Sequence, residues 1–332
     1  MIMDTKVIFT PFYNGHNGYI DIMKFAYKTA GTQVLPFRSV KNLFSADYAV
    51  LNWYESISPS KVPFKKIFWF LIRYFTIIFL KIRNVKIIWT LHNKEPHNRH
   101  FAELSIIMMK FLAKNSDFIV IHSSASIKTL EKLVKNKFFE YKTILIPHPN
   151  YGNYYGNPIE RDILNNEKLQ LLFLGGNAKH KNLEILIEAV KELNLPNLDL
   201  KIADEYIPND LIARYISNCH ALIIPYDTKT MLNSGTVMLA FSYKRTVISP
   251  SIGTLEDIGD KTLFFDYSYS CNKEHREKLS ETIMKIYYEY EGKYDNLLNI
   301  GKKCFDYVEK NNGIEKIALA LKMKIFEGGN YV

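Results

Sequence analysis

The sequence predicts an α/β protein with two domains, each built on a parallel β-sheet. Three observations predict this class. The chain has 332 residues, and domains usually span about 100–200 residues. Short runs of β-branched and aromatic residues alternate with helical patterns, which is typical of βαβ units. The alternation stops at residues 150–167, a segment rich in Gly, Asn and Pro, and then starts again.

In the first half, six runs are expected to be strands because polar or turn-forming residues end each of them. They are 6–10, 32–37, 48–53, 85–91, 117–123 and 143–148. Helical patterns between them cover 18–30, 102–115 and 124–136.

The second half repeats this organisation. Its expected strands are 169–176, 198–204, 221–226, 246–250 and 262–267. Its expected helices include 181–193, 211–219 and 234–244. We therefore expect a Rossmann-like domain at 1–150, a second at 151–310, and a C-terminal helix at 311–332 that can cross back to the first domain. Ligands bind at the carboxyl ends of parallel strands, so we expect the two sheets to face each other across a cleft.

Composition limits the class of protein. Hydrophobic residues make up 47% and charged residues 23% of the chain, so a disordered or fibrous protein is excluded. The three cysteines (Cys219, Cys271 and Cys304) are far apart and form no CxxC pair. This fits a reducing compartment and argues against structural zinc. The N-terminus lacks the pattern of a secretory signal, so a cytoplasmic protein is expected.

Charge is distributed unevenly. Residues 1–150 hold 21 basic and 9 acidic side chains, whereas the remainder holds 22 basic and 25 acidic ones. A basic half indicates contact with an anionic surface, either nucleic acid or anionic lipid.

Residues 61–90 combine many aromatic side chains with lysine and arginine. Their apolar core, residues 67–80, is too short to cross a bilayer. Two interpretations remain open: a domain helix with a basic solvent edge, and an interfacial helix on an anionic membrane. Nucleic acid is disfavoured because the aromatics are dense and no nucleic-acid motif is present. The residues expected to meet membrane or acceptor are Lys65, Lys66, Trp69, Arg73 and Tyr74.

Two segments of the second half have the pattern of an anion site. In the first, the expected strand 169–176 ends in Gly175 and Gly176, and a helix is expected to open at Lys181. A helix N-terminus offers backbone N–H groups and positive dipole to an anion, and Lys179 and Lys181 add charge. The chemistry indicated is diphosphate binding; the alternative is an ordinary turn with solvated lysines.

The second segment follows the expected strand 221–226. Asn233, Ser234 and Thr236 are residues that favour helix N-termini, and Gly235 allows close approach to the backbone. Two such helix starts fit a nucleotide diphosphate better than a lone phosphate, although a simple capped helix is the alternative. After the strand 246–250, Glu256 is either a ribose hydrogen-bond acceptor or a helix cap.

The first half contributes polar loops after two expected strands. Gly15 and His16 follow the first strand, and His92 and Glu95 follow the fourth. Histidine with its near-neutral pKa suits hydrogen bonding or acid–base work. His148 lies close to the hinge. Structural roles are the alternative for each histidine, and no set of metal ligands is evident.

The order of these motifs resembles GT-B-fold glycosyltransferases of the group called family 4, which act in bacterial capsule, exopolysaccharide and O-antigen synthesis. The segments FLGG…KHKNLEILIEAV, NSGTVMLAFSYK and IIWTLHN carry the resemblance. It implies that Lys181 and the turn 234–236 bind the donor diphosphate and that His92 contacts the transferred sugar. Gly15 and His16 would approach donor or acceptor.

The chain departs from the family pattern at two places. Gly176 stands where the family has an arginine, so Lys179 would supply that charge. Met231 and Leu239 stand where the family has paired glutamates, which leaves the choice between retention and inversion open. Glu256 is a candidate substitute for the second glutamate.

The resemblance therefore implies transfer of a sugar from a nucleotide-diphosphate donor to a saccharide carried on polyprenyl diphosphate. No DxD-type strand end is present that would hold a divalent ion, so we expect transfer without metal or cofactor. The protein would attach peripherally to the inner face of the cell membrane and would bind no nucleic acid. In an inverting route His16 or Glu95 would take the acceptor proton. A nucleotide-sugar epimerase and a non-catalytic transferase-like scaffold are the alternatives.

Overall fold

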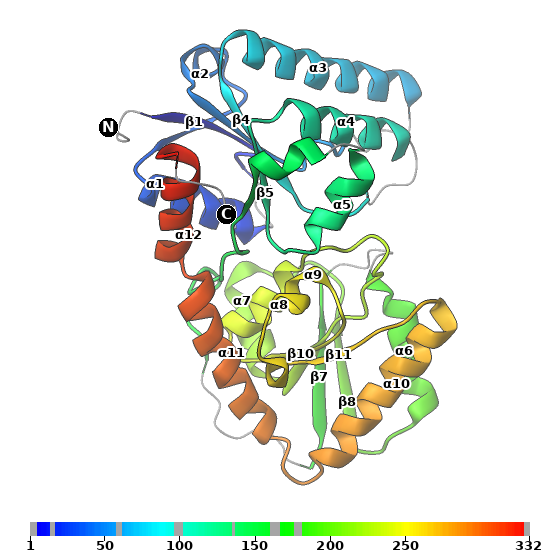
Figure 1. Ribbon diagram of the computed structural model, residues 1–332. Helices are drawn as coiled ribbons and strands as arrows, with labels where there is room; N and C mark the ends of the chain where they lie inside the picture. Colours follow the sequence, from blue (N-terminus) through cyan, green and yellow to red (C-terminus); the bar gives the residue numbers. More distant parts are fainter. Residues whose placement is uncertain are drawn as a thin grey trace. The chain divides into compact units, whose positions relative to one another are not determined.

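The computed structural model describes residues 5–13, 17–57, 62–95, 102–134, 137–159, 167–175 and 181–328. The chain divides into two compact units: Met1–Pro149 with Ile314–Val332, and Asn150–Gly313. Within the described ranges, each unit contains one sheet in which every strand pairing is parallel (Figure 1). The predicted α/β class with two parallel sheets is confirmed.

The first unit has a six-stranded sheet in the order β2-β1-β3-β4-β5-β6. Its strands are β1 (Lys6–Thr10), β2 (Gln33–Pro36), β3 (Tyr48–Asn52), β4 (Lys86–Leu91), β5 (Phe118–Ile121) and β6 (Thr143–Leu145). Its helices are α1 (Gly18–Thr29), α2 (Val40–Ser45), α3 (Pro63–Ile82), α4 (Ala102–Asn115), α5 (Ser126–Leu133) and α12 (Ile314–Leu321).

The core of the first unit is made by side chains that alternate along the strands. Val7 and Phe9 of β1 point to the same face, as strand geometry requires. There they pack with Ile20 of α1 and Ile317 of α12, so the last helix of the chain completes this core. Figure 1 shows α12 beside α1, and shows α3 alongside α4.

The second unit has a five-stranded sheet in the order β11-β10-β9-β7-β8. Its strands are β7 (Leu169–Leu174), β8 (Leu198–Ala203), β9 (Ala221–Ile223), β10 (Thr246–Pro250) and β11 (Phe265–Tyr267). Its helices are α6 (Leu183–Leu193), α7 (Asn209–Ser217), α8 (Gly235–Ser242), α9 (Gly253–Glu256), α10 (Asn272–Glu289) and α11 (Asn296–Asn312).

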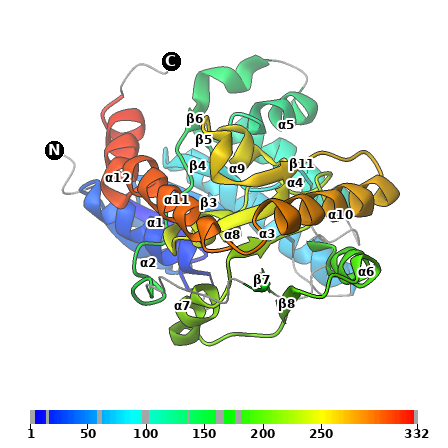
Figure 2. The ribbon, with the colours of Figure 1, turned by 90° about the horizontal axis from the view of Figure 1, so that it is seen from below.

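Two helices cover one face of this second sheet. Leu171 and Phe173 of β7 pack with Leu186 of α6 and Ile283 of α10. The helices α6 and α10 lie against each other in both ribbon views (Figures 1 and 2). On β10 the contacts are instead with α8 and α11.

The strand orders locate one special position in each sheet. In the first unit β1 pairs with both β2 and β3, and in the second unit β7 pairs with both β8 and β9. The next strand along the chain lies on one side of β1 or β7, and the strand after that lies on the other side. The strand order thus reverses there, which makes each position a topological switch point. Ligands of open α/β sheets bind outside the carboxyl ends of the strands at such points. The residues that follow β1, β3, β7 and β9 are therefore the first place to look for a site.

Helix α3 is unusual because its exposed face is apolar. Four large side chains, each four or seven positions from the next, form a stripe along it. These are Phe64 (77% exposed), Phe68 (51%), Phe75 (61%) and Ile82 (74%). The opposite face is buried and includes Ile77 and Leu80.

Lys66 is a correction to the sequence-based expectation. Lys66 is only 3% exposed, so its side chain does not lie on the helix surface where it could contact lipid headgroups. The reason is that α3 is apolar on both sides, and its hydrophobic pattern alone does not decide which side faces inward. In the part of the chain that the structure describes, no helix is both long and apolar enough to cross a bilayer.

Candidate functional site

In the second unit, β7 is followed by a glycine that leaves room for a lysine side chain. Gly175 has a φ of +120°, a conformation that favours glycine, and its N–H donates to the Ala203 carbonyl at 2.9 Å. The Lys181 Nζ donates to the Leu174 carbonyl at 3.4 Å and occupies the space where a Cβ of residue 175 would lie. Burial lowers the pKa of Lys181 to about 8. The site therefore holds an amine that gains from an anionic partner.

The helix behind Lys181 begins slightly later than the sequence predicts. The first residue of α6 is Leu183, and Asn182 before it adopts a left-handed conformation with a φ of +45°. Lys181 thus precedes the helix instead of opening it. Gly176 and Lys179, which the sequence analysis assigned to the same anion site, lie outside the described residues.

Helix α8 starts beside this edge, since it follows β9, the neighbour of β7 in the sheet. Ser234 is its N-cap: the Ser234 Oγ accepts from the Val237 N–H at 3.1 Å and shares a 2.7 Å hydrogen bond with the Tyr226 hydroxyl. The Ser234 N–H donates to Thr254 Oγ1 of α9 at 2.9 Å. Within the described residues, the N–H groups of Gly235 and Thr236 have no bonded acceptor, as expected for the first turn of a helix.

Asn233, directly before the cap, is a buried amide without partners. The residue is 9% exposed, and neither its Oδ1 nor its Nδ2 bonds any atom of the described chain. A buried polar group without a hydrogen bond costs about 1–3 kcal/mol. Asn233 is therefore a group that a polar ligand at the α8 N-terminus could satisfy.

Glu256 is the last residue of α9, which follows β10, the strand next to β9. Its side chain is exposed to solvent, and its main-chain carbonyl accepts from the Lys261 Nζ at 3.2 Å. The structure thus brings Glu256 to the same carboxyl edge as Ser234. Its carboxylate forms no hydrogen bond or ion pair within the described residues.

In the first unit, three buried histidines come from successive strand ends. His92 follows β4, His122 follows β5, and His148 comes shortly after β6. The ring centroids of His92 and His122 are 5.5 Å apart, and those of His122 and His148 are 5.4 Å apart. Despite this clustering, no group of three or more His, Cys, Asp or Glu side chains in the described ranges is arranged to hold a metal ion.

Hydrogen bonds fix the tautomers of this cluster in its neutral state. The His122 Nδ1–H donates to the Ile146 carbonyl at 2.8 Å, so its Nε2 accepts from the Tyr19 hydroxyl at 2.9 Å. The Asn52 Nδ2 donates to the Thr10 carbonyl at 3.3 Å, and its Oδ1 accepts from the His92 Nε2–H at 3.1 Å. His92 therefore has its lone pair on Nδ1.

Burial keeps these imidazoles uncharged. Desolvation, helped by the neighbouring histidines, lowers the pKa of His92 well below its usual value. Desolvation likewise lowers the pKa of His122 to about 4 and that of His148 to about 3. At neutral pH the cluster presents neutral hydrogen-bonding groups. Glu95, three residues after His92, is exposed, and Gly15 and His16 lie outside the described residues.

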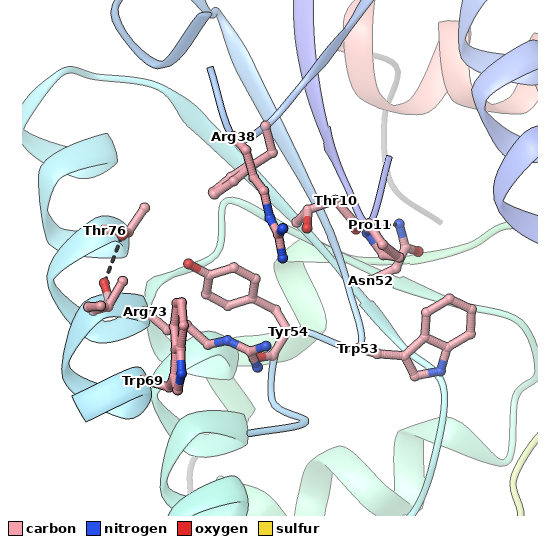
Figure 3. Close-up of a pocket in the computed structure, with 11 residues that line it drawn as sticks. Thr10, Pro11, Arg38, Asn52, Trp53, Tyr54, Trp69, Arg73 and Thr76 are labelled. Carbon is pink, nitrogen blue, oxygen red and sulfur yellow. Dashed lines mark hydrogen bonds between the residues drawn. The ribbon is translucent and has the colours of Figure 1, made fainter. Parts of the chain in front are cut away.

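A cavity of about 530 Å³ lies beside the cluster, at the switch point of the first sheet. Thr10 at the end of β1 and Asn52 at the end of β3 line it, as do Arg38 and Arg73 (Figure 3). Trp53 also lines it and stacks on the His92 ring, with centroids 4.0 Å apart. The cavity and the histidine cluster thus share Asn52 and Trp53 as a common wall.

The residues expected on the membrane-facing helix divide into outward and inward groups. Lys65 and Trp69 are exposed, and Trp69 also lines the cavity. Arg73 points inward: its Nη1 donates to the carbonyls of Tyr54 and Ser56, both at 2.6 Å. Tyr74 packs on Phe111 of α4 with ring centroids 4.3 Å apart.

Several residues of these sites were not predicted from the sequence. Tyr19, Asn52 and His122 belong to the cluster, and Arg38 belongs to the cavity. A usable signal exists for Asn52 and His122, since each is the polar residue that ends or follows an apolar strand run. No comparable signal marks Tyr19 or Arg38.

Comparison with solved structures defines the fold. The whole chain is similar to sucrose-phosphate synthase from Thermosynechococcus elongatus, with a TM-score of 0.71, 13% identity and 98% of both chains covered. It is also similar to Anabaena HepE in complex with UDP-glucose, with a TM-score of 0.64, 11% identity and 97% and 99% coverage. For the lipopolysaccharide outer core galactosyltransferase WaaB, the TM-score is 0.53 and the identity is 13%, with 97% of this chain and 100% of that chain covered. The fold is GT-B, and the resemblance to GT-B-fold glycosyltransferases is confirmed.

Sequence comparison adds particular relatives. The chain is 25% identical to a GDP-mannose:glycolipid 4-beta-D-mannosyltransferase of Xanthomonas campestris pv. campestris, over 52% of this chain and 52% of that protein. A second such enzyme from a strain of the same pathovar is 26% identical over 29% of this chain and 35% of its own length. The match thus spans about half the length of the first relative and about a third of the second. A scan against protein-family models found no match.

Proposed function

We propose that this protein is a glycosyltransferase that moves a sugar, without a metal ion, from a nucleoside-diphosphate sugar to a saccharide carried on a membrane lipid by a diphosphate. The observation that carries the proposal is the edge formed by Lys181, Asn233 and the α8 N-terminus. These groups offer one amine, a buried amide and two backbone N–H groups at the switch point of a GT-B unit, and neither the amide nor the two N–H groups has a hydrogen-bond partner among the described residues.

The chemistry needed at this edge is stabilisation of a leaving group. When the bond between the sugar C1 and the diphosphate oxygen breaks, negative charge grows on the nucleoside diphosphate. Positioned N–H donors and a lysine stabilise such charge most in the transition state. The acceptor oxygen then bonds C1, and its proton passes to a base, either Glu95 or the leaving phosphate. The neutral His92, held through Asn52, serves as a hydrogen-bonding partner for the transferred sugar.

The similarity to mannosyltransferases that act on a glycolipid supports a lipid-carried acceptor. Helix α3 supports it independently, because its exposed stripe of Phe64, Phe68 and Phe75 has no covering element in the described chain. Residues 1–150 carry 21 basic and 9 acidic side chains, so an anionic bilayer complements this region in charge. Each basic side chain near such a surface contributes about 1 kcal/mol. We propose peripheral attachment through α3 to the inner face of the cell membrane.

The donor assignment is tested by thermal unfolding with nucleoside diphosphates and nucleotide sugars. A ligand that binds only the folded state raises Tm by mass action. We expect UDP or GDP to raise the Tm and expect the shift to persist in EDTA. A panel of nucleotide sugars without any shift contradicts the proposal. Release of nucleoside diphosphate only when acceptor is present separates transfer from epimerisation.

The membrane assignment is tested by co-sedimentation with phosphatidylglycerol vesicles. We expect binding at low salt and release at high salt, because charge attraction is screened. Phe75→Asp, in the stripe, should abolish sedimentation. Tyr288→Asp is the matched control, since Tyr288 is as exposed as Phe75 (both 61%) but lies on α10 of the other unit. Equal loss in both variants, or no binding by the unmodified protein, removes α3 as the attachment helix.

A further inference from the structure

The cavity at the switch point of the first unit contains two arginines among its described lining residues. Arg38 follows β2 and Arg73 comes from the middle of α3, and both line the space of about 530 Å³. Figure 3 shows both side chains directed toward the same space. None of the described residues that line this cavity is an aspartate or glutamate.

The two guanidinium groups keep donors for a ligand. Arg73 uses Nη1 for the carbonyls of Tyr54 and Ser56, and its guanidinium lies 5.2 Å from the centre of the Tyr54 ring. Its Nε and Nη2 bond no atom of the described residues, and the Arg38 guanidinium likewise bonds none. Arginine holds phosphate oxygens with paired N–H groups, so two arginines around one cavity favour a diphosphate or a similar dianion.

The buried carboxyl group of Glu55 does not neutralise this charge by direct pairing. Glu55 interacts electrostatically with Arg73, but its Oε2 accepts from the Trp89 Nε1–H at 3.2 Å and forms no ion pair within the described chain. Glu55 is buried, and it is not among the described residues that line the cavity. The cavity surface itself is therefore cationic.

The walls indicate what the anion is attached to. On one side the cavity is closed by Trp69 and Ile72 of α3, which are also 45% and 38% exposed at the helix surface. An apolar wall thus runs from the cavity to the exposed stripe of α3. At the other end, Figure 3 shows Asn52 and Trp53, both of which contact His92.

We infer that this cavity is the acceptor subsite of the proposed transferase and binds the diphosphate of a prenyl-diphosphate-linked saccharide between Arg38 and Arg73. The inference rests on the proposed function. The prenyl chain leaves along Trp69 toward the α3 stripe, and the saccharide extends toward Asn52 and His92. A nucleoside diphosphate shares the anion, but the absence of an acidic side chain among the described lining residues disfavours it, because ribose hydroxyls are commonly held by a carboxylate.

The inference is tested with farnesyl diphosphate, a short water-soluble probe, using intrinsic fluorescence. Two of the three tryptophans, Trp53 and Trp69, line the cavity. We expect saturable quenching by farnesyl diphosphate and much weaker binding of farnesol, inorganic pyrophosphate and UDP or GDP at this site. Farnesol binding as tightly as farnesyl diphosphate, or UDP or GDP competing equally for the site, overturns the inference.

Arginine variants locate the effect. Arg38→Gln should weaken farnesyl diphosphate binding by about 10-fold or more, the usual loss of a charge-assisted hydrogen bond. The control is Arg83→Gln, because Arg83 is exposed at the end of α3 and donates to the Phe44 carbonyl outside the cavity. Arg38→Lys should recover part of the affinity. Unchanged affinity in Arg38→Gln contradicts the inference even if Arg73→Gln fails to fold.

The two proposals fail in distinguishable ways. Phosphatidylglycerol vesicles without any diphosphate report on α3 alone, so Arg38→Gln should leave their binding unchanged. The Tm shift by UDP or GDP reports on the second unit, and Arg38→Gln should leave it unchanged as well. If that shift occurs in the unmodified protein but farnesyl diphosphate does not bind, the acceptor subsite is wrong and the donor assignment stands. If no nucleotide shifts the Tm, the proposed function fails first.

Discussion

The carboxyl edges of the two sheets differ in how their polar groups are satisfied. At the first edge, Tyr19 donates to His122, and His92 donates to Asn52, so the cluster is bonded internally. At the second edge, within the described residues, Asn233 has no hydrogen-bond partner, and the Lys181 ammonium bonds one carbonyl at 3.4 Å. One edge is preorganised in the free protein, and the other is completed by a ligand.

This difference suits two different tasks. A neutral network that bonds itself holds its donors and acceptors at fixed positions, which orients a sugar without attracting ions. An edge with unused N–H groups and a partly desolvated lysine gains more from an anion, because those groups lose their desolvation cost when it binds. We therefore expect substitutions at the second edge to change donor binding, and substitutions in the first cluster to change turnover and stability.

The largest effect is expected from Lys181. Lys181→Ala should lower the rate of transfer by about 10²–10³-fold, as for loss of a donor to developing negative charge. Because the pKa of Lys181 is lowered to about 8, donor affinity should also fall as the pH rises above that value and the amine loses its proton. The measurement is kcat and KM for the donor between pH 6.5 and 9. The control, Lys191→Ala, changes an exposed lysine in the last turn of α6, the helix that follows Lys181. Equal effects in both variants contradict a role for Lys181.

His92 should have a smaller effect that appears in turnover. His92→Ala removes a buried hydrogen-bonding group, a loss of about 1–3 kcal/mol, so kcat should fall by about 10–100-fold. The Tm shift by nucleoside diphosphate should remain. His220→Gln is the control, because His220 is also buried but precedes β9 and accepts from the Gln170 N–H at 3.0 Å. Loss of the nucleotide shift in His92→Ala would mean that the cluster supports folding instead of turnover.

The sequence predicts the individual elements well because local patterns define them. The run that ends in Thr90 and Leu91 is rich in apolar and β-branched residues, and polar residues begin at His92. The sequence therefore predicts where β4 ends. The start of α6 is predicted less well: Asn182 adopts a left-handed conformation before the helix, and local propensity does not anticipate it. The proposed donor-binding residues Lys181 and Ser234 could be singled out from the sequence because each lies at a strand-to-helix turn.

Contacts between residues of different strands could not be predicted from the sequence. The pairing of Asn52 with His92 requires β3 and β4 to be neighbours, and the cavity requires β1 and β3 to be neighbours. Strand order depends on tertiary packing, so no local pattern of residues shows it. The same reason explains why Arg38 was missed, since its partner in the cavity, Arg73, is distant in the sequence.

The histidines predict an acid-sensitive stability. Burial lowers the pKa of His122 to about 4 and of His148 to about 3, below the usual 6.5 expected in the unfolded chain. The unfolded state therefore binds more protons in this range, so stability is full above about 6.5 and is lost as the pH falls toward 4. Tm should drop by about 5 °C or more between pH 7 and pH 5. His122→Gln should flatten this dependence, and an identical slope would contradict the assignment.

The smallest effects compare the two asparagines directly. Asn52 bonds both Thr10 and His92, whereas Asn233 bonds nothing in the described chain. Asn52→Leu should destabilise the protein by about 1–3 kcal/mol, because it leaves a carbonyl and an imidazole N–H unpaired. Asn233→Leu has a similar volume and removes an unsatisfied amide, so the ligand-free Tm should rise by a few degrees, about 2–4 °C per kcal/mol.

The same pair of variants should respond oppositely to ligand. Asn233→Leu should lose much of the Tm increase caused by UDP or GDP, whereas Asn52→Leu should keep it. Calorimetry with and without nucleotide measures both quantities in one experiment. If the two variants shift Tm in the same direction and keep the same nucleotide response, then the two edges do not differ in whether a ligand completes their hydrogen bonds. In that case the unpartnered amide of Asn233 is a structural feature of the α8 turn and has no role in binding the donor.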